Sequence, residues 1–257
     1  MRILVGKLCV TLVSATVLLW ATAALVGCGG DSNLFGDTHT TVGGAGGTGG
    51  TGGAGGTAGS TSVVKVAVMD GSNTTDELRT FLDGQPNIDA DTLNSCILGE
   101  LMAFDVIVVH SQMSCFENDD FNTYVVNGGG IIGVPWIHDY GEVSALPVTP
   151  DLVHKEMGAA LEMFAVEPSD PLLDGVTFQA GEAVAYERGA LPPRAGATVS
   201  ARWGDSTNTS AVVRWSHGAG RGVYLNFVYT HSCCPTAVHY GWGQTLIRNA
   251  VHWAAGE

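Results

Sequence analysis

The sequence predicts an α/β domain built on a mostly parallel sheet that is flanked by helices. Short runs of β-branched and other apolar residues, at 63–69, 104–110 and 131–134, match strands that are buried on both faces. Helix signals separate these runs, and the C-terminal half adds further β-rich runs between turns. The folded part, residues 63–257, is long enough to form one domain with its own core.

The first part of this domain alternates strands with helices. Residues 63–69 form the first strand, which we expect at the centre of the sheet. Thr74 and Glu77 match a capping box, and an apolar stripe follows them, which predicts a helix. Residues 92–103 are predicted as a second helix that leads into the strand at 104–110.

The next elements continue the alternation. Residues 119–127 predict a third helix that ends at three glycines, 128–130, and residues 131–134 follow as a strand. Alternating strands and helices predict parallel pairing with right-handed crossovers.

The second half has a different pattern. Thr149 as N-cap and Pro150 at the first helical position predict a helix to about Phe164. Three β-rich runs separated by turn residues then predict an antiparallel extension of the sheet; they lie at 197–203, 210–216 and 221–229. A final helix covers residues 241–255, and Gly256 is expected to end it.

The N-terminal residues predict a targeting signal and are not expected to belong to the folded domain. Arg2 and Lys7 precede an apolar stretch that ends in Leu25-Val26-Gly27-Cys28, which resembles a bacterial lipoprotein signal over residues 1–27. Cys28 would carry the lipid, and Gly29 favours the outer membrane. The alternative is a transmembrane anchor. No basic cluster follows the apolar stretch, which argues against this alternative.

Residues 28–62 predict a lipidated cysteine followed by a flexible tether. They are rich in glycine and threonine and repeat with a period near three, but they lack the proline of collagen. Without residues 1–27 the chain has nine basic and twenty-five acidic residues, a formal charge of −16. A surface this acidic repels phosphate backbones, so nucleic acid is not an expected partner.

The cysteines of the folded part predict disulfides, because the compartment beyond the inner membrane is oxidising. Cys96 and Cys115 are expected to pair and to close a short loop. Cys233 and Cys234 would pair with each other under strain, or one would stay free. The alternative is a metal site or a reactive thiol.

Ligands of open α/β sheets bind beyond the carboxyl ends of the parallel strands. The residues after the predicted strands are polar and aromatic, and three of them are the histidines His110, His138 and His231. These histidines suit acid–base work or a divalent metal, but no diagnostic ligand spacing accompanies them, so no metal or cofactor is expected. The expected ligand-binding residues are Asp70, Asn73, Trp136, Tyr140 and Tyr229, with Asp139 and Glu182 as further carboxylates.

Five segments in order give a family resemblance: 104–110, 128–134, 170–178, Glu182 with Tyr186, and 220–226. Together they resemble the landmarks of ThuA-like (trehalose-utilisation) domains across residues 63–255. The resemblance implies the class I glutamine-amidotransferase-like superfamily and a flavodoxin-like fold. It also implies a link with sugars.

Amidotransferase chemistry in that superfamily needs a thiolate at a strand-to-helix elbow and a histidine that a carboxylate orients. Here the corresponding residues, 132–136, contain neither cysteine nor serine, and His231-Ser232-Cys233 stands where the superfamily has His-x-Glu. ThuA-like proteins often have histidine where this chain has Pro135. Glutamine hydrolysis is therefore not expected.

The expected function is a carbohydrate-binding, glycan-binding or scaffolding module on the cell envelope. An enzyme is the alternative: a hydrolase or isomerase acting on a sugar derivative, with His110, His138 or His231 as base and Asp139 or Glu182 as partner. A purely structural surface protein is the third interpretation. Two histidines and a carboxylate in close approach would favour the enzyme.

Overall fold

The computed structural model describes residues 62–69, 75–110, 119–135, 143–149, 156–158, 162–179, 184, 186–188, 192–204, 209–229 and 236–257. All of them belong to one compact unit, Thr57–Glu257. Within these ranges no helix is both long enough and apolar enough to cross a bilayer. The predicted signal, the lipidation site Cys28 and the tether up to residue 61 lie outside the described residues.

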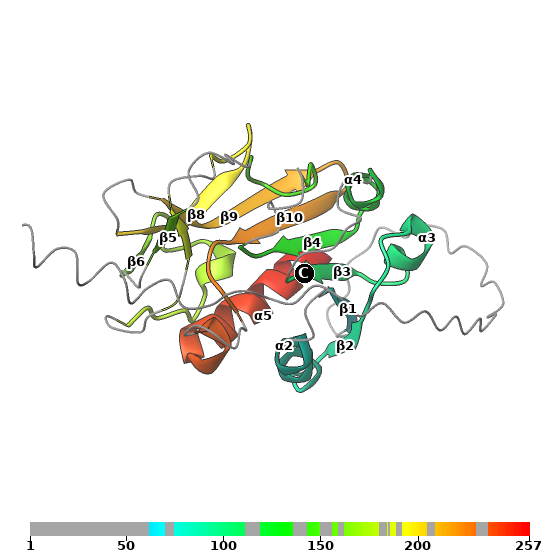
Figure 1. The fold of residues 1–257 in the computed structure, drawn as a ribbon, viewed down its shortest axis with the longest axis horizontal. Coiled ribbons are helices and arrows are strands. Elements are labelled where there is room, and N and C mark those ends of the chain that lie inside the picture. The colour runs from blue at the N-terminus through cyan, green and yellow to red at the C-terminus, as the bar shows by residue number, and fades with distance from the viewer. Residues whose placement is uncertain are drawn as a thin grey trace, which may run out of the picture. The chain divides into compact units, whose positions relative to one another are not determined.

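An eight-stranded mixed sheet forms the centre of the domain (Figure 1). Its order is β2 (Ile88–Thr92), β1 (Val64–Met69), β3 (Val106–Val109), β4 (Gly130–Gly133), β10 (Gly220–Leu225), β9 (Ser210–His217), β8 (Thr198–Trp203) and β6 (Met163–Ala165). The first five strands pair in parallel, and their succession is the flavodoxin-like order 2-1-3-4-5. The last three pair antiparallel, and two of them, β9 and β8, confirm runs predicted for the extension. The third predicted run, 221–229, gives β10, which is antiparallel to β9 but also pairs in parallel with β4.

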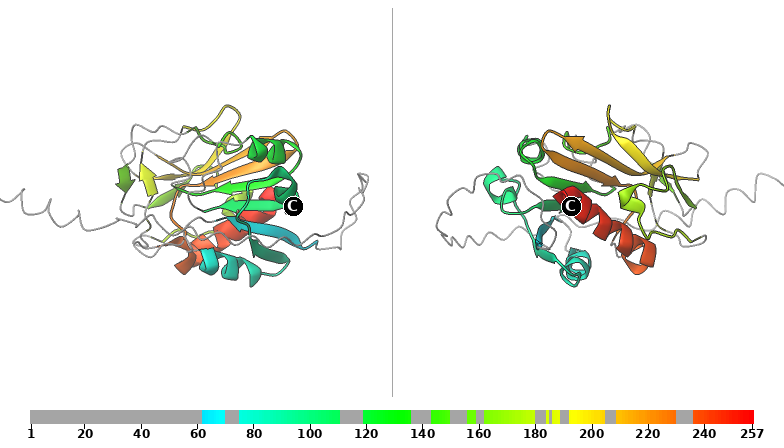
Figure 2. Two further views of the ribbon diagram at one scale, coloured as in Figure 1. Left: turned by 45° about the vertical axis from the view of Figure 1, so that its right-hand side comes forward. Right: turned by 180° about the vertical axis from the view of Figure 1, so that it is seen from behind.

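Helices cover both faces of this sheet (Figure 2). The helices α2 (Thr75–Asp83) and α5 (Gly241–Ala255) pack on one face, where Leu78 and Leu246 share a hydrophobic core with Val66 and Val68 of β1. The helices α3 (Leu98–Leu101) and α4 (Asp120–Val126) pack on the other. Because side chains alternate along a strand, β1 contributes to both cores, as expected of a strand covered on both sides.

Short elements complete the fold. Two 3-10 turns, η2 (Pro171–Leu173) and η3 (Ala237–His239), contact α5, and β5 (Glu156–Gly158) pairs with β7 (Tyr186–Arg188) in a separate two-stranded sheet. Helix α5 ends as predicted, because Gly256 adopts a left-handed conformation with φ of 97°.

Two predictions for the first half were wrong. The strand β1 is second from the edge rather than central, because β2 pairs on its outer side. Residues 88–92 alternate a buried Ile88 and Ala90 with an exposed Asp89 and Asp91, which is the pattern of an edge strand. Thr92 therefore ends a strand instead of starting a helix, and the helix predicted at 92–103 is only the short α3.

The helix predicted from Thr149 to Phe164 was also wrong. Its described parts include β5 and the beginning of β6, and Met163 and Phe164 pair with Trp203 and Arg202 of β8. Helix signals at the start of a segment were here overridden by strand pairing at its end. Pro150 to Lys155 lie outside the described residues.

Candidate functional site

The carboxyl edge of the sheet, where the parallel strands end, is the candidate site. Met69, Val109, Gly133 and Tyr224 stand level with one another at the ends of β1, β3, β4 and β10. The chain leaves β1 for β2 on one side and returns to β3 on the other, so the loops after β1 and β3 diverge. This is the switch point at which doubly wound sheets bind their ligands.

His110 is the first residue beyond β3 and lies directly at this switch point. Its backbone N–H donates to the carbonyl of Met69 over 2.9 Å, which extends the β1–β3 ladder by one bond. Its side chain is buried, with 2% of the residue exposed. His110 is therefore buried beneath the carboxyl edge and is not part of its exposed surface.

Most of the other predicted site residues lie outside the described residues. They are Asp70, Asn73, Cys115, Trp136, His138, Asp139, Tyr140, Glu182, His231, Cys233 and Cys234. The described part of the chain contains no group of three or more histidine, cysteine, aspartate or glutamate side chains that could hold a metal ion.

Tyr229 follows β10 and is fully buried. Its hydroxyl donates to the carbonyl of Gly243 over 3.3 Å, and its ring packs against Phe227. Burial raises the pKa of the Tyr229 hydroxyl well above the ordinary 10.0. In the described structure Tyr229 thus holds α5 against the end of β10 from inside the core.

Residues 230–235 lie outside the described range, but both flanks of this segment are described. The carbonyl of Val228 accepts from the N–H of Ala237 over 2.8 Å, and the carbonyl of Tyr229 accepts from that of Val238 over 3.1 Å. These two hydrogen bonds pin both ends of the segment that contains His231 to the carboxyl edge.

The structure reveals a histidine–carboxylate pair at this edge that the sequence did not predict. His239 Nε2 lies 3.1 Å from Oε1 of Glu77, and His239 Nδ1 lies 2.6 Å from Oγ1 of Thr236. Glu77 is in the first turn of α2, which follows β1, and His239 ends η3, which follows β10. The pair therefore joins the elements that come after two different loops of the carboxyl edge.

An aromatic group surrounds the start of α5. The Tyr240 ring lies almost parallel to that of Trp242, with centroids 6.2 Å apart, and Phe178 meets Trp242 edge-on at 5.7 Å. Trp242 is buried against Phe227, whereas Tyr240 and Phe178 are half-buried. Tyr240 and Phe178 therefore keep part of their surface accessible beside the start of α5.

Cys96 is buried and disulfide-bonded, and its partner lies outside the described residues. The pairing with Cys115 therefore stays a prediction.

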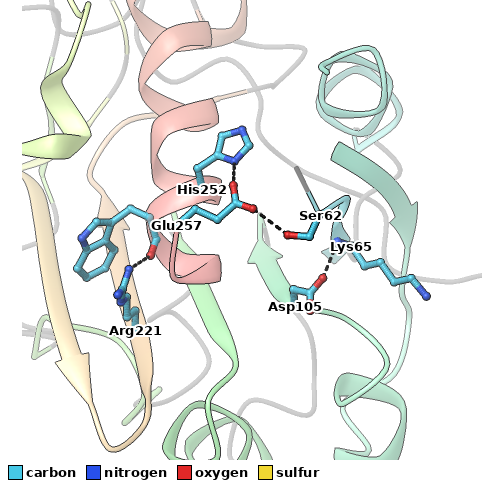
Figure 3. Close-up of polar contacts among 7 residues, drawn as sticks. Ser62, Lys65, Asp105, Arg221, His252 and Glu257 are labelled. Carbon is cyan, nitrogen blue, oxygen red and sulfur yellow. Dashed lines mark hydrogen bonds and ion pairs between the residues drawn. The ribbon is translucent and has the colours of Figure 1, made fainter. Parts of the chain in front are cut away.

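A second histidine–carboxylate pair lies at the opposite edge, where β1 begins (Figure 3). There His252 Nδ1 is 2.6 Å from Oε2 of Glu257, whose Oε1 accepts from the hydroxyl of Ser62 over 3.1 Å. Arg221 donates to the carbonyl of Trp253 nearby, over 2.6 Å. Because α5 ends at this edge, its start lies at the carboxyl edge.

Comparison with known proteins supports the fold. No family model matches the chain, and no curated protein matches it in sequence. A solved ThuA-like protein from Bacteroides uniformis is similar in structure, with a TM-score of 0.55, 15% identity, and 75% of this chain and 91% of that chain covered.

Two cytoplasmic proteins from Salmonella typhimurium are similar to the same degree. One has 17% identity and covers 74% of this chain and 98% of its own, and the other has 16% identity and covers 74% and 99%; both have a TM-score of 0.56. At these identities the likeness shows the fold alone. The chain thus has the fold that the ThuA-like resemblance implied.

Proposed function

We propose that this chain is a lipid-anchored protein of the bacterial cell envelope whose ThuA-like domain binds carbohydrate or envelope glycan at its carboxyl edge. The lipobox-like sequence ending in Cys28 supports the anchor and an outer-membrane location. The flavodoxin-like order of the parallel strands supports the site at the switch point. Residues 132–136 lack cysteine and serine, which argues against glutamine hydrolysis.

The observation that carries the binding proposal is the half-buried Tyr240 beside Trp242 at the start of α5. Sugars present a face of C–H groups that packs on an aromatic ring, while their hydroxyls hydrogen-bond to polar groups around it. Tyrosine suits such a contact because its ring is apolar and its hydroxyl is polar. The parallel ring of Trp242 and the edge contact with Phe178 fix this platform in place.

A glycan array and a monosaccharide binding screen on the purified full chain, with and without a chelator, test this proposal. We expect binding that survives the chelator and that falls about tenfold in Tyr240→Ala, as for the loss of one aromatic contact. Trp215→Ala is the matched control, because Trp215 is also half-buried and stacked, on His217 with centroids 4.2 Å apart, but in β9. No binding to any glycan would reject the proposal.

An enzyme acting on a sugar derivative, a hydrolase or isomerase, is the second candidate. The specific observation in its favour is the imidazole of His239 beside the carboxylate of Glu77, since acid–base catalysis needs such groups within hydrogen-bond reach. The predicted base, His110, His138 or His231, would act with Asp139 or Glu182 as its partner. Turnover of a glycan during the same screen would identify this activity. The absence of both binding and turnover would favour a structural role.

The proposed anchor has its own test. Cys28→Ser should abolish incorporation of a labelled fatty acid and release the protein from the membrane fraction. The length of a C-terminally tagged wild type shows whether residues 1–27 are removed. If they are retained, the leader is not cleaved, which would indicate a transmembrane anchor.

A further inference from the structure

We propose that Arg214 and Arg221 bind a single phosphate group beside Trp253, near the edge of the sheet opposite the carboxyl edge. This second edge, where β1, β3, β4 and β10 begin, is called the amino edge. The inference is independent of the proposed function, because it uses other residues at another edge. The segments that carry the three side chains, 209–229 and 236–257, are described without a break.

The register of the sheet places the two arginines side by side on one face. Arg214 of β9 lies opposite Val223 of β10, and Arg221 lies two residues before Val223. Side chains two residues apart on a strand share a face, so the arginines are diagonal neighbours, a separation that long side chains can span. Helix α5 covers this face, since its Leu246 shares a core with Val223.

Both arginines also contact one aromatic ring, that of Trp253 in α5. The guanidinium carbons of Arg214 and Arg221 lie 5.6 and 5.2 Å from its centroid. A guanidinium over an aromatic face is attracted by the ring quadrupole, which restrains an otherwise flexible side chain. The shared ring therefore gathers two cations at one place, in agreement with the register of β9 and β10.

Most of the hydrogen-bond donors of these arginines are unused. A guanidinium carries five N–H groups. Arg214 donates from Nε to Oδ2 of Asp170 over 2.7 Å, and Arg221 donates from Nη1 to the carbonyl of Trp253 over 2.6 Å (Figure 3). The terminal nitrogens of Arg214, and Nε and Nη2 of Arg221, have no partner among the described residues. Both side chains are partly exposed, so a ligand can reach these donors.

The two positive charges are only partly balanced. Within the described part of the chain, Asp170 is the only carboxylate that pairs with either guanidinium. The partial negative charge at the C-terminal end of α5 offsets some of the charge of Arg221. The remaining positive charge lies on a chain with a formal net charge of −14, so it attracts one small anion while the rest of the surface repels a polyanion.

A phosphate group suits this pair better than a carboxylate does. The two oxygens of a carboxylate are occupied by the fork of a single arginine, whereas a phosphate has further oxygens for a second fork. The contacts with Trp253 and Asp170 already restrain both forks, so little side-chain freedom is lost on binding. A soluble phosphomonoester and the phosphodiester of a lipid headgroup both present the inferred group.

The first experiment follows the indole N–H of Trp253 by NMR in the purified full chain, while inorganic phosphate is added at constant ionic strength. Trp253→Phe assigns its signal among those of the six tryptophans. We expect this signal to shift until it saturates with phosphate, and to shift much less with acetate. A signal that does not respond to phosphate, or that responds equally to acetate, would overturn the proposal.

Two soluble esters distinguish the sources of the phosphate group. Glycerol phosphate is a monoester, and glycerophosphoglycerol carries the diester of a lipid headgroup. Tighter binding of the monoester at the Trp253 signal would identify a soluble ligand, and tighter binding of the diester would identify a lipid headgroup. Failure of both esters to bind would contradict a site for a phosphate group within a larger ligand.

The second experiment removes one fork. Because hydrogen bonds to a charged group are lost, we expect the affinity of Arg221→Met for phosphate to fall about tenfold or more. Arg79→Met is the matched control, since it removes the same charge from an arginine of α2 whose side chain is 32% exposed, against 25% for Arg214. Equal losses in Arg221→Met and Arg79→Met would show that net charge alone drives binding, and would overturn the site.

Lysine substitutions separate the forks from their charge. Arg221→Lys and Arg214→Lys keep the charge, and Arg214→Lys also keeps a cation beside Asp170, but an ammonium group cannot form the bidentate contact. We expect each variant to bind phosphate several-fold more weakly, with the free energy of unfolding nearly unchanged in Arg221→Lys. Full affinity in both lysine variants would contradict recognition by the guanidinium forks.

Discussion

The Oδ2 atom of Asp170 lies 2.7 Å from Nε of Arg214, and the Asp170 side chain is completely buried. The same oxygen accepts from the hydroxyl of Ser200 over 2.9 Å, and Oδ1 accepts from the N–H of Leu172 over 3.0 Å. These contacts tie η2 to β8 and β9. Asp170 belongs to one of the segments that resemble ThuA-like domains, and its surroundings show that it holds the antiparallel half of the sheet together.

Loss of Arg214 should be strongly destabilising. Arg214→Leu leaves the buried carboxylate of Asp170 without its cation, so we expect the free energy of unfolding to fall by about 3–5 kcal/mol. Urea denaturation measures this change. Arg79→Leu is the control, because its pair with Asp76, at 4.0 Å, is exposed and should contribute no more than about 1 kcal/mol.

Two glycines in the first turn of α5 should respond in opposite ways to alanine. A Cβ on Gly243 would collide with the backbone carbonyl of Ala237 in η3, whereas one on Gly241 would enter open space. We expect Gly243→Ala to cost about 1–3 kcal/mol, as overpacking does, and Gly241→Ala to be neutral or stabilising by up to about 1 kcal/mol. Equal melting temperatures for the two variants would contradict this difference.

Two buried tyrosines should make the domain less stable at alkaline pH. Burial raises the pKa of Tyr229 and, together with the charge of Asp105, that of Tyr124, both above the ordinary 10.0. The folded protein therefore keeps protons that the unfolded chain loses. The stability from these groups is complete below pH 10 and declines as the pH rises above it.

Alkaline unfolding followed by tyrosinate absorbance tests this dependence. Wild type should lose stability more steeply with pH than Tyr229→Phe, which cannot ionise at that position. Identical slopes would show that Tyr229 titrates alike in the folded and unfolded chain.

Cys96 is disulfide-bonded, and Cys115 is its predicted partner. A non-reduced digest should therefore yield a peptide that joins these two cysteines. Cys115→Ala should lower the free energy of unfolding by about 3 kcal/mol, as the loop-entropy estimate gives for a loop of this length. A peptide that joins Cys96 to Cys233 or Cys234 would contradict the pairing.

The sequence allowed the parallel core to be predicted because local and tertiary signals agree there. The strands at 64–69, 106–109 and 130–133 are mostly apolar, and Asp119 and Asn127, ordinary start and stop residues, flank the helix α4. At 88–92 the signals conflict, because aspartate disfavours strands and only the alternation with Ile88 and Ala90 marks β2. For β6 the deciding factor is its partner β8, which is distant in sequence.

The site was predicted in part for a similar reason. The rule that ligands bind at strand ends located the carboxyl edge and His110. It did not find Glu77, which matched a capping box, or His239, which lies ten residues beyond Tyr229. Their contact joins positions 162 residues apart, and the only local signal was a histidine two residues before the last helix.

The hydrogen bond from Ser62 to Glu257 places the first and last described residues of the domain side by side, at the edge opposite the carboxyl edge. A short peptide could therefore join these two residues, and new termini could be opened elsewhere on the surface by circular permutation. The domain could likewise be inserted into a loop of a host protein, with both junctions at one point and the carboxyl edge on the opposite side.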